Sequence, residues 1–320
     1  MNTKIIDHKE IQRAAEIIKS GGLAAFPTET VYGLGADAMN PIAVAKVFEL
    51  KERPSFDPLI VHISDIEMLE LLTIRTDERV FKLAEKFWPG PLTIVLPKSP
   101  SVPDIVTSGL PTVGIRMPDN PIALELIRQC GRPLAAPSAN RFGRISPTRA
   151  EHVRKQFPKL ECILNGGQCR VGIESTVIAL NDDGFIILRQ GVVTAEALET
   201  ILPASKQKTD SSPLVNSSPG LMKSHYSPEK PLYIIGEGSL PGNKERAGLI
   251  CFGKADTFGY KIIYNLSGSS DILEAAVNLF DALHFMEDAD IDHIVTHTVP
   301  ETGIGSAIMD RLRKAAYRYK

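Results

Sequence analysis

Hydrophobic positions along the chain alternate between two spacings, and this alternation predicts an α/β protein. Apolar residues at helical spacing over 11–18 stop at Ser20-Gly21-Gly22, which is typical of a helix C-terminus. Short apolar runs bounded by turn residues separate the helical segments and predict buried strands. The predicted helices are 11–18, 42–50, 80–87, 121–129 and 148–156, and the predicted strands are 23–35, 59–63, 92–96, 113–117, 133–140, 162–164, 172–178 and 186–191.

The segment Phe26–Gly35 carries polar groups where a buried strand would reach the surface. It contains Thr28, Glu29, Thr30 and Tyr32, and its glycines permit close approaches that a side chain would block. A small polar substrate would need such a set of groups. A Pro-Thr turn that joins two strands explains the segment equally well when it is taken alone.

Other predicted strands also end in polar or charged side chains. Arg116 lies inside an apolar strand, where an arginine needs an anionic partner, either a substrate carboxylate or a structural one. Small residues in 133–140 leave room beside their hydroxyl and amide groups. Ser175 and Arg189 also lie at strand ends. Because open α/β sheets bind ligands where strands end, we expect these ends to form one site.

Two cations and a histidine have two interpretations each. Lys51 and Arg53 follow helix 42–50, where they either complement the helix dipole or, held by the stiff loop 54–58, face an anionic ligand. His62 is the ionisable member of an apolar strand, and a histidine there is more often a hydrogen-bonded core residue than a ligand-binding one.

The amino-acid composition of the chain changes after residue 202. Residues 203–230 are rich in proline and serine and predict a linker. The segment 218–228 within it contains a more varied set of side chains, including His225 and Tyr226, than a simple spacer requires. A second α/β unit follows, with strands near 231–235, 248–252, 261–266 and 293–299 and helices near 270–287 and 306–318. The predicted domains are therefore 1–202, the linker 203–230, and 231–320.

Composition excludes several classes of protein. The 320 residues are 43% hydrophobic and 23% charged with a net charge of −2, which is ordinary for a globular chain and gives no basic excess for nucleic acid. The start has no signal-peptide core and no apolar run is long enough for a membrane, so we expect a soluble cytoplasmic protein.

Metal and phosphate motifs are weak. The four cysteines form no Cys-x-x-Cys pair and are expected as buried free thiols, and His293 and His297 have no evident third ligand. Gly303-x-Gly305-Ser306 either binds phosphate at a helix N-terminus or is a plain helix start, and the full glycine fingerprint is absent.

Four motifs, in this order, resemble the YrdC-like threonylcarbamoyl-AMP synthase family. They are Pro27-Thr28-Glu29-Thr30-Val31-Tyr32-Gly33-Leu34, Lys51-x-Arg53, Phe87-Trp88-Pro89-Gly90-Pro91-Leu92-Thr93 and Ala136-Pro137-Ser138-Ala139-Asn140. The resemblance covers about residues 8–200. The motif ending in His225-Tyr226 and the C-terminal unit, with Gly303-x-Gly305-x-Ala307 and Asp310-Arg311-Leu312, resemble the longer two-domain branch. In the linker the chain departs from the family, with Leu221-Met222-Lys223 where Met and a basic residue usually follow Ser-Pro-Gly.

The resemblance implies a twisted, open, mixed sheet with flanking helices and a smaller Rossmann-like C-terminal domain. It also implies a reaction of L-threonine, bicarbonate and ATP, with magnesium, that gives threonylcarbamoyl-AMP and pyrophosphate for modification of tRNA next to the anticodon. A tRNA threonylcarbamoyl transferase machinery would receive the product, and tRNA binding is not required. No protein nucleophile is needed, so positioned cations and donors should dominate.

By the same resemblance, Lys51 and Arg53 would act in catalysis. The implied ATP contacts are Lys51, Arg53, Asp57, Thr112, Ser138, Asn140, Ser146, Arg189, His225 and Tyr226. The implied threonine contacts are Thr30, His62, Arg116, Ala136 and Ser175, and no protein metal site is implied. We further expect the linker to act as a lid that closes His225 or Tyr226 over the nucleotide.

Two other functions are alternatives for a chain with this sequence. An RNA-binding module is one, because Arg141, Arg144, Arg149, Arg154 and Lys155 form a basic stretch that is otherwise a solvated face. A carbamoyl-transfer enzyme of the same fold is the other, but its zinc-finger cysteine pairs and acylphosphatase segment are absent from this sequence.

Overall fold

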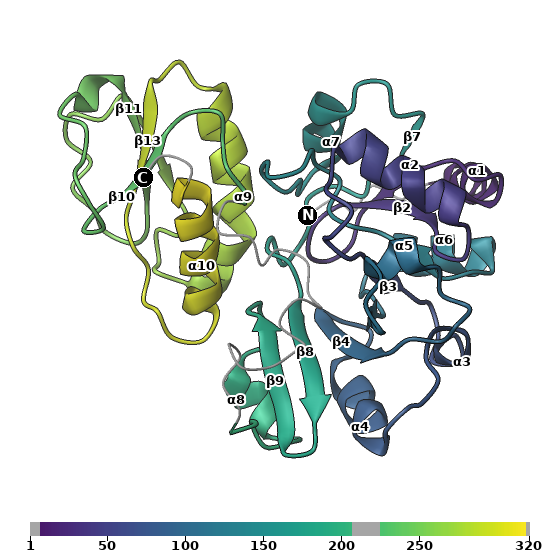
Figure 1. The fold of residues 1–320 in the computed structure, drawn as a ribbon. Coiled ribbons are helices and arrows are strands. Elements are labelled where there is room, and N and C mark those ends of the chain that lie inside the picture. The colour runs from purple at the N-terminus through teal and green to yellow at the C-terminus, as the bar shows by residue number, and fades with distance from the viewer. Residues whose placement is uncertain (1–6, 207–224, 318–320) are drawn as a thin grey trace.

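A large mixed sheet organises the first two-thirds of the chain in the computed structural model, which describes residues 7–206 and 225–317 (Figure 1). Its strands follow the order β7-β1-β2-β6-β3-β5-β4-β8-β9. They are β1 (Ala24–Phe26), β2 (Gly33–Asp37), β3 (Ile60–His62), β4 (Leu92–Pro97), β5 (Thr112–Arg116), β6 (Leu134–Ala135), β7 (Cys162–Ile163), β8 (Thr176–Asn181) and β9 (Gly184–Arg189).

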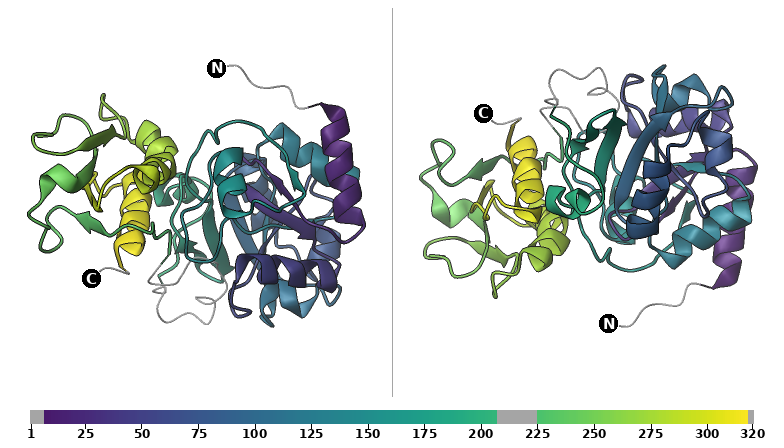
Figure 2. Two further views of the ribbon diagram at one scale, coloured as in Figure 1. Left: turned by 90° about the horizontal axis from the view of Figure 1, so that it is seen from above. Right: turned by 90° about the horizontal axis from the view of Figure 1, so that it is seen from below.

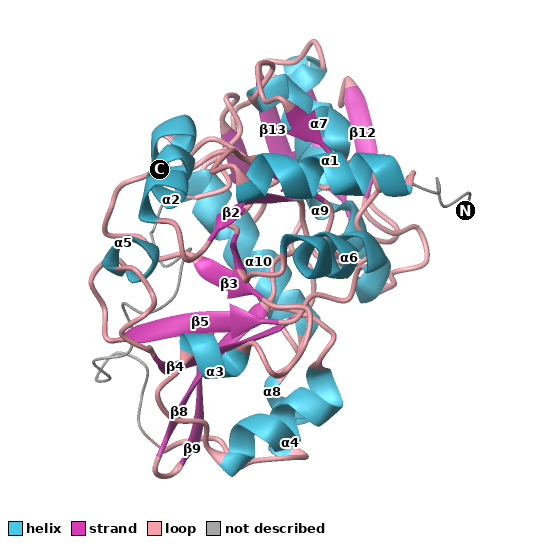
Figure 3. Cartoon of the chain, turned by 90° about the vertical axis from the view of Figure 1, so that its right-hand side faces the viewer, coloured by secondary structure: helices cyan, strands magenta, loops and turns pink. Residues whose placement is uncertain are grey.

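Helices flank this sheet, and local sequence explains where the longer ones begin. They are α1 (His8–Lys19), α2 (Pro41–Lys51), α3 (Leu69–Leu72), α4 (Glu78–Phe87), α5 (Asp104–Thr107), α6 (Pro121–Cys130), α7 (Ala150–Gln156) and α8 (Ala195–Glu199). The side chains of Asn40 and Asn120 cap α2 and α6, each followed by proline at the first helical position. α1 and α6 lie side by side over one part of the sheet (Figure 3). The pattern did not predict α3, α5 and α8, because four or five residues are too short to show a helical period.

The last third of the described chain forms a second, parallel sheet of order β10-β13-β11-β12. Its elements are β10 (Leu232–Ile234), the short 3₁₀ helix η3 (Lys244–Arg246), β11 (Ala247–Cys251), β12 (Ile262–Asn265), α9 (Ile272–Asp288), β13 (His293–Thr296) and α10 (Ile304–Ala316). The predicted fold class, a large mixed sheet with a smaller α/β unit, is confirmed.

Helices α9 and α10 lie between the two sheets and face the larger part of the chain (Figure 2). One hydrophobic core joins both parts, because Val31, Ile145 and Ile173 pack in the same cluster as residues of α9 and α10. Gly172 lies where an added Cβ would come within 2.4 Å of the backbone of Ala276 and Val277. The predicted domain boundaries remain a prediction, and residues 207–224 of the predicted linker, with Leu221-Met222-Lys223, lie outside the described residues.

Three predicted strands differ from the observed ones. The segment after Phe26 leaves the sheet and returns at Gly33, and every residue from Ala24 to Ala38 is buried, so it does not reach the surface. The strand predicted at 133–140 shortens to β6, whose flanking prolines cannot donate to a ladder. The strand predicted at 172–178 begins only at Thr176, because the preceding residues form a loop.

Three further features of the described residues are the cysteines, the start of α10 and the absence of a membrane-spanning helix. All four cysteines are buried and free, as expected. Gly303 is the N-cap of α10, and Gly305 is required because an added Cβ would lie 1.8 Å from the Pro300 carbonyl oxygen. Over 7–206 and 225–317, no helix is long and apolar enough to cross a membrane.

Candidate active site

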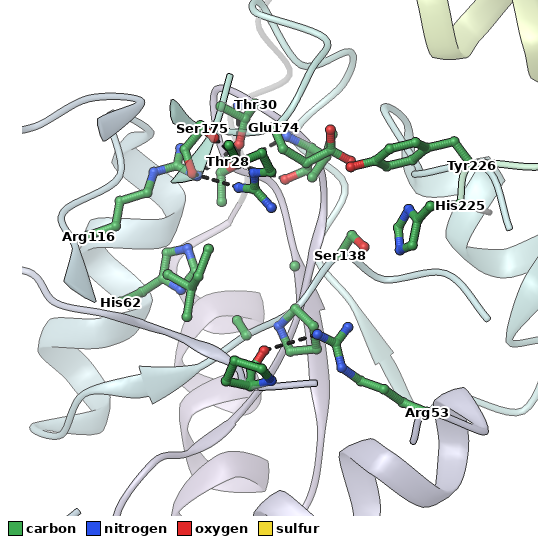
Figure 4. A pocket seen from close by; sticks show the side chains of 17 residues that line it. Thr28, Thr30, Arg53, His62, Arg116, Ser138, Glu174, Ser175, His225 and Tyr226 are labelled. Atoms are coloured by element: carbon green, nitrogen blue, oxygen red, sulfur yellow. Dashed lines mark hydrogen bonds between the residues drawn. The ribbon is translucent and has the colours of Figure 1, made fainter. Parts of the chain in front are cut away.

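A pocket lies at the edge of the large sheet where β3, β5 and β9 end and where β4 and β8 begin. The hollow, including its open mouth, measures about 580 Å³. Figure 4 shows its lining residues, which are Thr28, Thr30, Val31, Gly33, Arg53, Pro58, Ile60, His62, Arg116, Ala136, Pro137, Ser138, Glu174, Ser175, Arg189, His225 and Tyr226.

The loop between β1 and β2 provides one wall. Thr28 Oγ1 donates to the Val31 carbonyl oxygen at 2.6 Å and lies 2.8 Å from Thr30 Oγ1. Thr30 Oγ1 also accepts a hydrogen bond from Arg116 Nη1 at 3.0 Å. These contacts show that the loop is an ordered, buried wall rather than a simple connection between strands.

Arg116 has a structural carboxylate partner. Its Nη2 lies 2.6 Å from Glu29 Oε1, and both side chains are almost fully buried. Its Nε donates to the Gly90 carbonyl oxygen at 3.2 Å. Of the two partners considered from the sequence, the structure therefore contains the structural one, and it fixes the guanidinium beside the pocket.

Arg189 and Ser175 form the next wall. Arg189 Nε and Nη2 donate to the carbonyl oxygen and to Oγ of Ser175 at 3.1 and 3.0 Å. Thr93 Oγ1 lies 2.8 Å from the same Ser175 Oγ. Burial lowers the pKa of the Arg189 guanidinium.

Lys51 and Arg53 are both buried and are held by hydrogen bonds to nearby loops. Lys51 is buried at the end of α2 and its Nζ donates to the carbonyl oxygens of Ser138 and Asn140. Arg53 donates to the carbonyl oxygens of Asp57 and Pro58 and lies 2.9 Å from Asp57 Oδ2. Burial lowers the pKa of Lys51 well below its ordinary value and raises that of Asp57.

His62 is buried and lines the pocket. Its Nδ1 has no hydrogen-bond partner among the residues that the structure describes. Burial, with Arg116 nearby, lowers its pKa to about 3, so the imidazole is neutral at pH 7.

His225 and Tyr226 line the side of the pocket opposite His62 (Figure 4). Tyr226 takes a left-handed backbone conformation with φ of 61° and packs 5.3 Å from the Phe280 ring of α9. Burial lowers the pKa of His225 well below its ordinary value, and the cations Arg53 and Lys51 lower it further. The segment that would form the rest of the predicted lid lies outside the described residues.

The structure brings most of the predicted site residues together, but not all. Lys51, Asp57 and Asn140 lie behind the lining, where they contact its loops. Ser146 also lies behind it and donates to Glu174. Thr112 begins β5, at the opposite end of that strand from Arg116, and does not line the pocket.

Sequence reasoning missed Glu174 and left Glu29 without a role. Glu174 directly precedes Ser175, and that adjacency was the available signal. Tyr32, also unassigned, has a structural role, since its hydroxyl donates to the Gly167 carbonyl oxygen and accepts from the Gly166 amide.

No protein metal site accompanies this pocket within the described ranges. No three His, Cys, Asp or Glu side chains there come together as possible ligands.

Comparisons with known proteins agree with the geometry. Residues 16–191 match the Sua5/YciO/YrdC family, described as "Telomere recombination", and residues 193–317 match "Threonylcarbamoyl-AMP synthase, C-terminal domain". The chain is 43% identical to the threonylcarbamoyl-AMP synthase of Pyrococcus abyssi, over 97% of this chain and 95% of the relative. This chain belongs to the threonylcarbamoyl-AMP synthase family.

Other members of the threonylcarbamoyl-AMP synthase family and solved structures give the same result. The Bacillus subtilis threonylcarbamoyl-AMP synthase is 42% identical over 96% of this chain and 93% of its own length. The crystal structure of P. abyssi Sua5 complexed with L-threonine superposes with a TM-score of 0.87 at 40% identity, covering 98% of this chain and 96% of that one. The resemblance predicted from the motifs is thus confirmed, and the chain is an enzyme of this family.

Proposed function

We propose that this enzyme is an L-threonylcarbamoyladenylate synthase that joins L-threonine, bicarbonate and ATP. The product, threonylcarbamoyl-AMP, would serve in the cytoplasm for threonylcarbamoyladenosine modification of tRNA next to the anticodon. The observation that carries the proposal is the convergence of three buried arginines, Arg53, Arg116 and Arg189, on one pocket of hydroxyl groups. Such a site suits a substrate with several anionic groups.

The proposed reaction has two steps. The threonine amine attacks the carbon of bicarbonate, and water leaves as the carbamate forms. A carbamate oxygen then attacks the α-phosphorus of ATP, and the bond from that phosphorus to the bridging oxygen breaks as pyrophosphate leaves. Neither step forms a bond to the protein, so the chain contributes alignment and charge.

The proposal assigns the residues of the site to the two substrates as follows. Arg116 would bind the threonine carboxylate, with Thr30 and Ser175 as neutral donors, and His62 and Ala136 would shape the same end. Arg53, Arg189 and Lys51 would balance the triphosphate, and Ser138, Asn140, Ser146, Asp57, Thr112, His225 and Tyr226 are the other proposed nucleotide contacts. The neutral His62 adds no charge beside Arg116.

Magnesium is proposed as an ion that arrives with the triphosphate, since the described residues provide no site of their own. When bound, it would neutralise phosphate charge. Transfer of the product to a tRNA threonylcarbamoyl transferase machinery is part of the same proposal.

The RNA-binding alternative gains no support from the basic stretch. Arg141, Arg144, Arg149 and Lys155 form ion pairs with acidic residues, and Arg154 donates to backbone carbonyl oxygens. The pairs of Arg149 and Lys155 join α7 to α9. The stretch is therefore neither a free basic patch nor only a solvated face.

The test is pyrophosphate release from ATP and magnesium, with threonine and bicarbonate omitted in turn and the product identified by mass spectrometry. Release should require both, and Arg53→Ala should lower it by about 100-fold or more, because a buried charged contact to the phosphates is lost. Lys46→Ala is the matched control, since Lys46 lies on α2 and its Nζ donates to the Gly21 carbonyl oxygen, outside the pocket. Release that does not depend on threonine would refute the proposal.

A further inference from the structure

Arg311 of α10 is fully buried, although it lies outside the large sheet that carries the pocket. Its side chain has 0% exposure, and arginines are rarely buried this deeply unless they are paired. Its Nε donates to Glu174 Oε2 at 3.2 Å. Glu174 is a lining residue of the pocket, so this bond connects the C-terminal sheet unit with the active site.

The Glu174 carboxylate is held from two sides. Its Oε1 accepts a hydrogen bond from Ser146 Oγ at 2.6 Å while Oε2 accepts from Arg311. The guanidinium also lies 5.8 Å from the centre of the Tyr226 ring, which lines the pocket. Arg311 thus contacts two lining residues from behind.

Arg311 is the direct counter-charge of Glu174 within a buried group of charged side chains. Two carboxylates, Glu174 and Asp310, lie with two cations, Arg311 and Lys314, because Asp310 Oδ2 is 3.1 Å from Arg311 Nη1 and 2.9 Å from Lys314 Nζ. Without Arg311, the Glu174 carboxylate would lose the cation that pairs with it directly, and its negative charge would draw on Arg189, a pocket cation that also interacts with it. That charge would lie at the wall of a pocket proposed to bind the most anionic substrate.

We propose that Arg311 is a positioning residue through which α10 neutralises and orients Glu174 so that the pocket accepts a nucleotide triphosphate. The inference rests on the proposed function and deepens it, because it gives the C-terminal unit a direct part in nucleotide binding. Arg311 acts through Glu174 and does not itself line the pocket.

The size of the effect follows from simple electrostatics. Two unit charges about 10 Å apart at an effective dielectric constant of about 20 change an affinity by about 15-fold. ATP carries several negative charges near neutral pH, whereas threonine is a zwitterion with no net charge. Loss of Arg311 should therefore weaken ATP binding much more than threonine binding.

The test measures ATP and threonine dissociation constants by calorimetry, with magnesium present, on the full chain. Arg311→Met should weaken ATP binding about tenfold or more and change threonine binding less than about threefold. The double variant Glu174→Gln with Arg311→Met removes both charges and should restore ATP binding to within about threefold of the parent. Arg313→Met, on the same helix and paired with Glu237 and Glu301 away from the pocket, is the matched control and should bind like the parent.

Rescue separates positioning by charge from simple packing. If Arg311 only supports Tyr226, the double variant will bind ATP as weakly as Arg311→Met, and this result would overturn the inference. Where Arg311→Met does not fold, Glu174→Gln and the double variant still decide: the first should bind ATP more tightly than the parent and the second about equally. A parent chain that binds no ATP would instead refute the proposed function itself, and the inference with it.

Discussion

Glu29→Gln tests how strongly the buried ion pair beside the pocket stabilises the fold. Glu29 and Arg116 have side-chain exposures of 0% and 4%, and 2.6 Å separates Oε1 from Nη2. Removing one partner of a buried pair costs about 3–5 kcal/mol, because the other charge stays buried. The glutamine keeps a polar oxygen of the same size beside the guanidinium, which offsets about 1 kcal/mol. We expect a loss of about 3 kcal/mol in the free energy of unfolding.

This loss is measurable as a shift in melting temperature. Unfolding entropy of about 2.1 cal/mol/K per residue, over 320 residues, gives about 0.7 kcal/mol/K. A loss of about 3 kcal/mol then lowers the melting temperature by about 4–5 °C, as followed by circular dichroism. Glu125→Gln is the control, since its pair with Arg128 is at the surface at 3.6 Å and should contribute less than about 0.5 kcal/mol. If the two variants melt within 1 °C of each other, the assigned energy of the buried pair is wrong.

Adding threonine to the same samples tests the proposed role of Arg116. In Glu29→Gln, the substrate carboxylate would become the anionic partner of the guanidinium, free of repulsion from Glu29. Saturating threonine should therefore raise the melting temperature of the variant more than that of the parent. An equal rise in both would show that the carboxylate binds elsewhere.

Two further predictions concern the contact between the two parts of the chain. Gly172→Ala should destabilise the protein by about 2 kcal/mol more than Gly167→Ala in urea unfolding, because both glycines have positive φ but only Gly172 packs against the backbone of α9; equal losses would argue against that packing. The stacked rings of His152 and His284 have pKa values lowered to about 3 and about 4, mainly by burial. Below about pH 6.5 the unfolded chain binds protons that the folded chain does not, so urea stability should fall by about 1 kcal/mol per pH unit for each histidine between pH 6.5 and 5. His284→Asn should show a shallower decline.

Local sequence patterns located most elements of the fold. The helix predicted at 121–129 is α6 at Pro121–Cys130, because an asparagine cap, a proline and apolar spacing all lie within the segment. The strand at 133–140 was overestimated, because apolar composition does not show which residues find a hydrogen-bonding partner strand.

The candidate site was predictable in its residue types but not in its partners. Polar residues at strand ends indicated that Arg116 and Ser175 would meet, and both line the pocket. The partners of these residues were not visible in the same way. Glu29 lies 87 positions from Arg116, and Arg311 lies 137 positions from Glu174.

The sequence by itself determined the α/β class, the family and the chemistry of the pocket, because each depends on spacing or on residue types within short segments. Only the tertiary structure decided that the segment after Phe26 is a buried wall, that Glu29 already pairs with Arg116, and that Arg311 reaches the site from α10. The reason is physical. A buried charge must find its counter-charge wherever the chain brings one within a few ångströms, and no local spacing records that distance.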